Sequence, residues 1–179
     1  MRKLILSNNV TLDGKVDDVL DWSIPGDDPD FVRRNVDLLK QSDGMILGRK
    51  SYEFFAALWP SRSGEFPDLM NGIAKYVAAS TLEDPEWQNT QLLEGDVVEA
   101  VAELKEQPGR DLILYASGSL SDTLMEQDLI DEYRLWVHPV VFGKGKSLFE
   151  DGLDRMDLEL VDSVAIPAGV VILTYRPKR

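Results

Sequence analysis

The chain of 179 residues has the size of one ordinary domain, and its 44% hydrophobic residues are enough to form a sizeable core. The formal net charge of −13 opposes binding to nucleic acid or to an anionic membrane surface. The sequence contains no cysteine, which excludes disulfides, thiolate metal sites and thiol nucleophiles. Without a membrane-length apolar run or a signal-peptide core, we expect a soluble cytoplasmic protein with one domain over residues 1–179.

Apolar strands alternate with amphipathic helices through the first two thirds of the chain. The patterns predict strands at 3–9, 44–48, 74–80 and 111–117, and helices at 28–42, 49–60, 96–109 and 120–130. The last part differs, because strand patterns follow one another at 132–143, 157–167 and 169–178. This order favours an α/β fold with a mostly parallel central sheet and an antiparallel hairpin at one edge.

Two of the predicted strands run into glycine-containing corners that begin a helix. The first corner is Gly48-Arg49-Lys50-Ser51 and the second is Ser117-Gly118-Ser119. Ligands of α/β sheets bind beyond the carboxyl ends of the strands, where helix N–H groups and the helix dipole attract anions. We therefore predict a pyrophosphate at the second corner, and at the first a further phosphate such as the 2′-phosphate of NADPH. Simple turn chemistry, with the serines as helix caps, is the alternative at each corner taken alone.

Longer segments resemble a known family. The stretch "GMILGRKSYE" is similar to the strand-Gly-Arg-x-Thr-helix segment of dihydrofolate reductase. Residues 112–152, with their Pro139-Val140-Val141 and Gly143-Lys144-Gly145, resemble the closing half of the C-terminal reductase domain of the riboflavin biosynthesis protein RibD, and Thr11–Lys15 resembles a Ser-x-Asp-Gly turn of these reductases. The resemblance implies a dihydrofolate-reductase-like three-layer α/β/α fold, NADPH as cofactor, and a stand-alone reductase domain without the deaminase domain of RibD.

The resemblance also implies roles for individual residues. Those expected to bind the cofactor are Gly48, Arg49, Lys50 and Ser51 at the phosphates, Ser80 and Thr81 beside the adenosine 2′-phosphate, and Ser117, Gly118, Ser119 and Leu120 at the pyrophosphate. At the second corner serine replaces the first glycine of the family's Gly-Gly pair.

The stretch "DWSIPGDDPD" is similar to a substrate-binding segment of bacterial dihydrofolate reductase. It would place Trp22 in a mobile loop near the substrate and Asp27 at the catalytic carboxylate that holds a pterin. Asp28 and Asp30 compete for that role, and Asp30 is the better candidate for a helix cap. The structural alternative is an acidic helix N-terminus favoured by the dipole.

His138 is the single histidine, and no second histidine or cysteine accompanies it, so we expect a structural residue and no metal site. The leading hypothesis is an NADPH-dependent reductase that transfers a hydride to a C=O or C=N carbon of a small substrate. A pyrimidine with a phosphorylated ribose, as in RibD, would need a second anion site, for which Arg33 and Arg34 are candidates. The alternatives are a dihydrofolate or pterin reductase, favoured by Asp27, and a non-catalytic nucleotide-binding protein of the same fold.

The apolar C-terminal strands, together with the resemblance, predict a homodimer that pairs through these strands. They carry large apolar side chains on more than one face of an expected edge hairpin. An exposed edge of that kind invites association, and a symmetric dimer would cover it.

Overall fold

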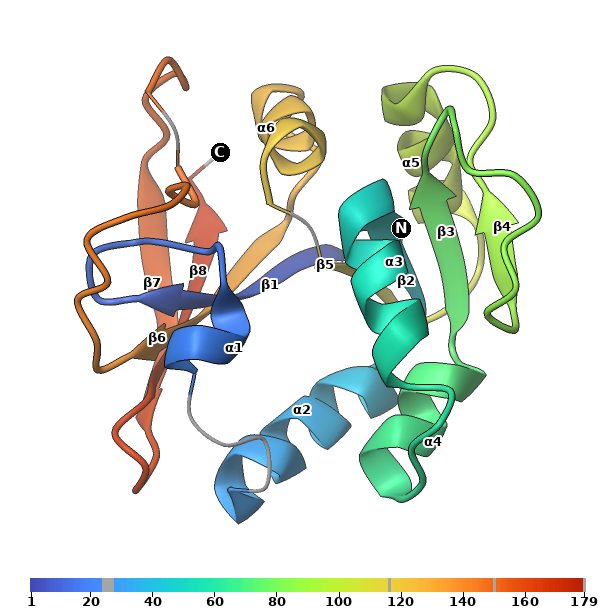
Figure 1. Ribbon diagram of the computed structural model, residues 1–179. Coiled ribbons are helices and arrows are strands. Elements are labelled where there is room, and N and C mark those ends of the chain that lie inside the picture. The colour runs from blue at the N-terminus through green and yellow to red at the C-terminus, as the bar shows by residue number, and fades with distance from the viewer. Residues whose placement is uncertain (24–27, 116, 150, 179) are drawn as a thin grey trace.

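The computed structural model describes residues 1–23, 28–115, 117–149 and 151–178. Within these ranges the strands form one sheet in the order β4-β3-β2-β5-β1-β6-β8-β7 (Figure 1). The strands are β1 (Leu4–Thr11), β2 (Ser42–Gly48), β3 (Ala74–Ala78), β4 (Thr90–Leu92), β5 (Asp111–Tyr115), β6 (Glu132–His138), β7 (Leu158–Ala165) and β8 (Val171–Pro177). The helices are α1 (Val19–Trp22), α2 (Pro29–Gln41), α3 (Arg49–Leu58), α4 (Glu65–Gly72), α5 (Val97–Glu106) and α6 (Ser119–Glu126).

Helices cover both faces of the sheet and bury an apolar core on each, and a third, smaller cluster of Trp136, Ile166, Val170 and Ile172 lies at the C-terminal hairpin. On one face, side chains of α2, α3 and α4 pack on β1, β2, β3 and β5 around Met45, Leu47 and Ile113. On the other face, α5 and α6 pack on the same part of the sheet around Ile46 and Leu114. Figure 1 shows α2 and α4 together below the sheet and α5 and α6 together above it. The predicted three-layer α/β/α fold is confirmed.

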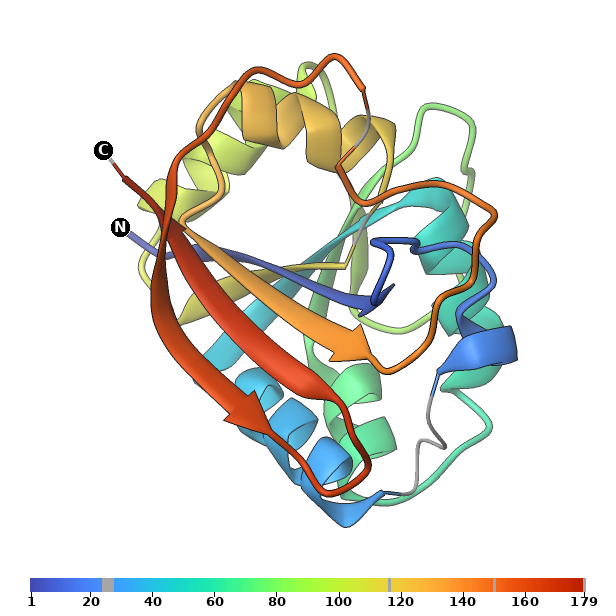
Figure 2. The same ribbon diagram turned by 90° about the vertical axis from the view of Figure 1, so that its left-hand side faces the viewer.

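Strands β1 to β6 pair in parallel, whereas β8 is antiparallel to both β6 and β7. Figure 2 shows this hairpin at one edge, with β8 against β6 and β7 outermost. The antiparallel edge hairpin is therefore confirmed. Its edge is β7, in which Leu160 and Val161 are exposed, whereas the more apolar β6 and β8 lie inside the sheet.

Three elements were not expected from the sequence, namely α1, α4 and β4. Helix α1 has four residues and β4 has three, too few to show a periodic pattern, and α4 contains Pro67 near its start. The strand expected over 132–143 ends at His138, because Pro139 has no backbone N–H with which to continue the ladder. In the described ranges, every helix is too short or too polar to cross a membrane.

Candidate functional site

The three predicted phosphate-binding segments lie next to one another at the carboxyl edge of the sheet. They follow β3, β2 and β5, which are consecutive in the strand order and parallel. The Arg49 guanidinium joins two of them by donating a hydrogen bond of 2.5 Å to Thr81 Oγ1. The third lies close by, since a Cβ atom built on Gly48 would lie 3.8 Å from Leu120 Cδ2. Residues from positions 48 to 120 are thus gathered into one site.

Helices α3 and α6 both begin on a glycine, and no described side chain caps either N-terminus. Helices α2 and α5, by contrast, are capped by the carboxylates of Asp28 and Asp96. The first N–H groups of a helix have no partner inside the helix and attract an anion together with the helix dipole. The N-termini of α3 and α6 therefore have backbone N–H groups without a side-chain cap, and such groups are suited to bind a phosphate.

The two corner glycines have different backbone conformations. Gly48 has φ −78° and ψ 167°, which other residues adopt readily, so its conformation does not require glycine. Gly118 has φ +82° and ψ −149°, a conformation that is essentially restricted to glycine. Ser121, which sequence reasoning did not single out, closes the second corner by donating a hydrogen bond of 2.8 Å from Oγ to Gly118 O. Ser117 and Ser119 remain exposed.

Arg49 is held in place before any ligand binds. Its Nε donates to Glu53 Oε1 at 2.7 Å, one helical turn later, and another nitrogen reaches Thr81. Sequence reasoning missed Glu53, although the spacing of four residues on a helix is a signal for such a pair. Lys50 and Ser80 are exposed beside this pair, and Ser51 is partly buried. The arginine therefore stands at the rim of the site in a fixed orientation.

The front turn is fixed to the loop that follows β6. Asp13 accepts hydrogen bonds from Thr11 Oγ1 at 2.6 Å, from Phe142 N at 3.1 Å and from Gly143 N at 2.8 Å. These bonds stabilise the carboxylate, with Thr11 contributing most, and they lower the pKa of Asp13 to about 2. The turn was expected, but its partner was not, because 129 residues separate Asp13 from Phe142.

Sequence comparison places the chain in a known family. The sequence matches the family model of the RibD C-terminal domain over residues 2–172. The chain belongs to the RibD C-terminal domain family. Protein YyaP of Bacillus subtilis (strain 168) is 35% identical over 184 residues, which cover 97% of this chain and 94% of YyaP.

Solved structures support the same family fold. A putative riboflavin biosynthesis protein from Shewanella superposes with a TM-score of 0.77 at 20% identity, covering 99% of both chains. Dihydrofolate reductase from Enterococcus faecalis, in complex with NADP(H), superposes with a TM-score of 0.65 at 16% identity, covering 99% of this chain and 97% of that one. The fold that this RibD C-terminal domain protein shares with dihydrofolate reductase is thereby shown.

On the expected substrate side, Trp22 is buried and its indole N–H donates to Asp17 O at 2.7 Å. Asp27 lies outside the described residues, so its role stays a prediction. The neighbouring carboxylates are placed: Asp28 caps α2 by accepting from Phe31 N at 2.9 Å, and Asp30 pairs with Arg33. The expectation that Asp30 caps the helix was wrong, because Pro29 takes the first helical position and leaves the cap to the preceding residue.

The candidates for a substrate anion site differ in their surroundings. Arg33 is exposed and its guanidinium lies 2.8 Å from Asp30. Arg34 Nε, in contrast, is buried without a hydrogen-bond partner in the described part of the chain. Of the two, Arg34 is the one with unused hydrogen-bonding capacity.

His138 is fully buried beneath Trp22 and lies 2.9 Å from Asn9 Oδ1. Burial lowers the pKa of His138 to about 4, so the imidazole is neutral at physiological pH. The described residues contain no cluster of acidic and imidazole groups able to hold a metal ion. These surroundings favour the structural interpretation of this histidine.

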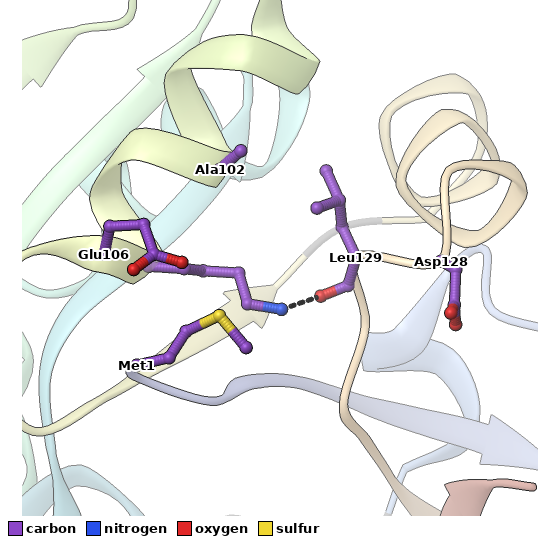
Figure 3. A pocket seen from close by; sticks show the side chains of 6 residues that line it. Met1, Ala102, Glu106, Asp128 and Leu129 are labelled. Carbon is purple, nitrogen blue, oxygen red and sulfur yellow. Dashed lines mark hydrogen bonds between the residues drawn. The ribbon is translucent and has the colours of Figure 1, made fainter. Parts of the chain in front are cut away.

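Two hollows lie outside the gathered corners. One, of about 280 Å³, is found where α5 and α6 end, and Figure 3 shows Ala102 and Glu106 on one side of it and Asp128 and Leu129 on the other. Its lining includes Lys105, whose amine donates to Leu129 O at 2.6 Å and pairs with Asp131 at 2.6 Å. The other, of about 460 Å³, lies between α3 and residues 82–87 and adjoins Glu53. The buried amine of Lys105 thus already has a carboxylate and a carbonyl as partners.

Proposed function

We propose that this protein is an NADPH-dependent reductase that transfers a hydride from the nicotinamide to a C=O or C=N carbon of a small substrate. The observation that carries the proposal is the pair of uncapped glycine corners at α3 and α6, side by side at the carboxyl edge of the sheet. A dinucleotide needs separate sites for its pyrophosphate and its 2′-phosphate, and in this proposal each corner would bind one of them. Membership of the RibD C-terminal domain family supports a reductase.

The 2′-phosphate is assigned to Arg49. Its guanidinium is fixed by Glu53 and Thr81 at the rim of the first corner, where it can make charge-assisted hydrogen bonds to a phosphate. The protein would contribute orientation of the two reactants, and the nicotinamide would supply the hydride.

The test compares two cofactors that differ only in that phosphate. Losing a charge-assisted hydrogen bond costs about 1.5 to 3 kcal/mol, so Arg49→Ala should weaken NADPH binding roughly 10- to 100-fold and leave NADH binding nearly unchanged. Arg155→Ala removes the same charge from an exposed arginine that pairs with Asp157, to which no role at the site is assigned, and serves as the matched control. Equal losses for NADPH and NADH would remove Arg49 from this role, and no binding of either cofactor by the unmodified protein would refute the reductase.

The substrate is to be identified by NADPH oxidation. Turnover of the pyrimidine ribosyl phosphate would favour the RibD-like reaction, and turnover of dihydrofolate would favour a pterin. Tight NADPH binding without oxidation by any reducible substrate pool would support the non-catalytic alternative. We also propose that residues 1–179 act as one domain in a cytoplasmic homodimer that pairs through the C-terminal hairpin.

A further inference from the structure

One side chain from the loop after β6 reaches the second corner. A Cβ atom built on Gly118 would lie 3.6 Å from Lys146 Nζ, and apart from the immediate chain neighbours of Gly118 this amine is the described atom nearest to that position. The two residues come from different elements, because Gly118 begins α6 and Lys146 follows β6. An ammonium group therefore lies beside the second corner, Ser117-Gly118-Ser119, whose own residues carry no positive charge.

The backbone at Lys146 is fixed from both sides by the front loop. Its N–H donates to Asp17 Oδ2 at 3.0 Å, and its carbonyl accepts from Val16 N at 3.0 Å. The preceding Gly145, at φ +83°, approaches Asp17 so closely that a Cβ atom there would lie 3.1 Å from Asp17 Cβ. Two residues further back, Asp13 holds Gly143 N. The lysine is thus presented from an ordered segment.

We propose that Lys146 binds the pyrophosphate of the dinucleotide, as a cofactor-positioning residue contributed by the loop after β6. This inference rests on the proposed function. The chain carries a net charge of −13, so an anionic ligand needs a local cation at the place where it binds. Arg49 serves the other corner, and because Gly118 has no side chain, the lysine amine lies close to the N-terminus of α6. A lysine, as a compact point charge, suits a phosphate group that also accepts backbone N–H bonds.

The chain offers a matched control in the same loop. Lys144 carries the same charge two residues earlier, but its amine lies over the ring of Phe142, 4.8 Å from the ring centroid. Both lysines are exposed, so their removal changes the net charge equally and leaves the buried core intact. Any difference between Lys146→Met and Lys144→Met therefore reports position rather than overall charge.

The experiment measures the dissociation constants of NADPH, NADH and ADP by titration at one low ionic strength. All three ligands contain the pyrophosphate, so Lys146→Met should weaken each of them about tenfold, since the contact is partly screened by water. Lys144→Met should bind all three as the unmodified protein does. Lys146→Arg, which keeps the charge, should recover most of the loss, and the affinity of Lys146→Met should fall less steeply with added salt.

Two outcomes would overturn the inference, and they differ in what else they refute. If Lys146→Met binds all three ligands within about twofold of the unmodified protein while Arg49→Ala still separates NADPH from NADH, the lysine has no such role and the proposed function stands. If the unmodified protein binds none of the three ligands, both proposals fail. A thermal melt of each variant shows that it is folded.

Discussion

Replacing Gly118 by alanine should affect the second corner in two ways. It should strain the backbone, and it should fill space that a phosphate needs. Gly118 adopts φ +82° and ψ −149°, and holding a residue with a Cβ atom there costs on the order of 1 to 3 kcal/mol. For a chain of this size, 1 kcal/mol lowers the melting temperature by roughly 2 to 4 °C, so Gly118→Ala should melt about 2 to 12 °C below the unmodified protein. The new methyl group would also stand 3.6 Å from Lys146 Nζ, where we place the pyrophosphate.

The matched variant is Gly48→Ala at the first corner. Gly48 has an ordinary φ of −78°, and among the described atoms its new Cβ would meet Leu120 Cδ2 at 3.8 Å, a normal van der Waals distance. Its melting temperature should therefore change little. Thermal denaturation followed by circular dichroism, with NADPH titration on the same samples, measures both effects. If Gly118→Ala melts no earlier than Gly48→Ala and binds NADPH equally well, the reasoning on the second corner is refuted.

Four further predictions follow from particular side chains. The lowered pKa of Asp13 stabilises the fold above about pH 4, so the stability gap between the unmodified protein and Asp13→Asn in urea denaturation should narrow as the pH falls toward about 2. Burial lowers the pKa of Lys75 from 10.5 to about 8 and penalises its charged form, so the unmodified protein should gain stability relative to Lys75→Met as the pH rises from 8 to 10.5, and a constant difference would contradict this. Asp27→Asn should lower the turnover of a dihydropterin and leave NADPH binding unchanged, whereas Asp28→Ala should cost about 1 kcal/mol of stability through the lost helix cap and leave turnover intact. Light scattering at micromolar concentration should show a dimer that Leu160→Glu on the exposed edge strand weakens, and a mass near 20.1 kDa for the unmodified protein would contradict the dimer.

The sequence predicted the parts of the fold that local patterns encode. Long apolar strands and amphipathic helices, together with the glycines at positions 48 and 118, marked both corners, because strand, turn and helix signals all lie within a few consecutive residues. The strand order was not predictable in this way. Placing β5 between β2 and β1 depends on packing between segments tens of residues apart.

The same distinction explains which site residues were missed. The contacts of Asp17 and Lys146 have no local signal in the sequence, since each residue meets a partner about 30 to 130 residues away. Ser121 was passed over because a serine inside a helical pattern has no distinguishing feature until the corner closes on its hydroxyl. Long-range pairing is decided by the folded chain as a whole. The family resemblance implied roles for residues at the corners, but none for Asp17 or Lys146.

The carboxylates of the front loop hold the backbone of the loop after β6, not its side chains. Asp13 accepts from the N–H groups of Phe142 and Gly143, and Asp17 accepts from that of Lys146. Every residue type except proline offers such an N–H group. The course of this loop is consequently set by backbone bonds that survive a change of side chain at Phe142 or Lys146, whereas Gly143 and Gly145, at φ +74° and +83°, have conformations that favour glycine.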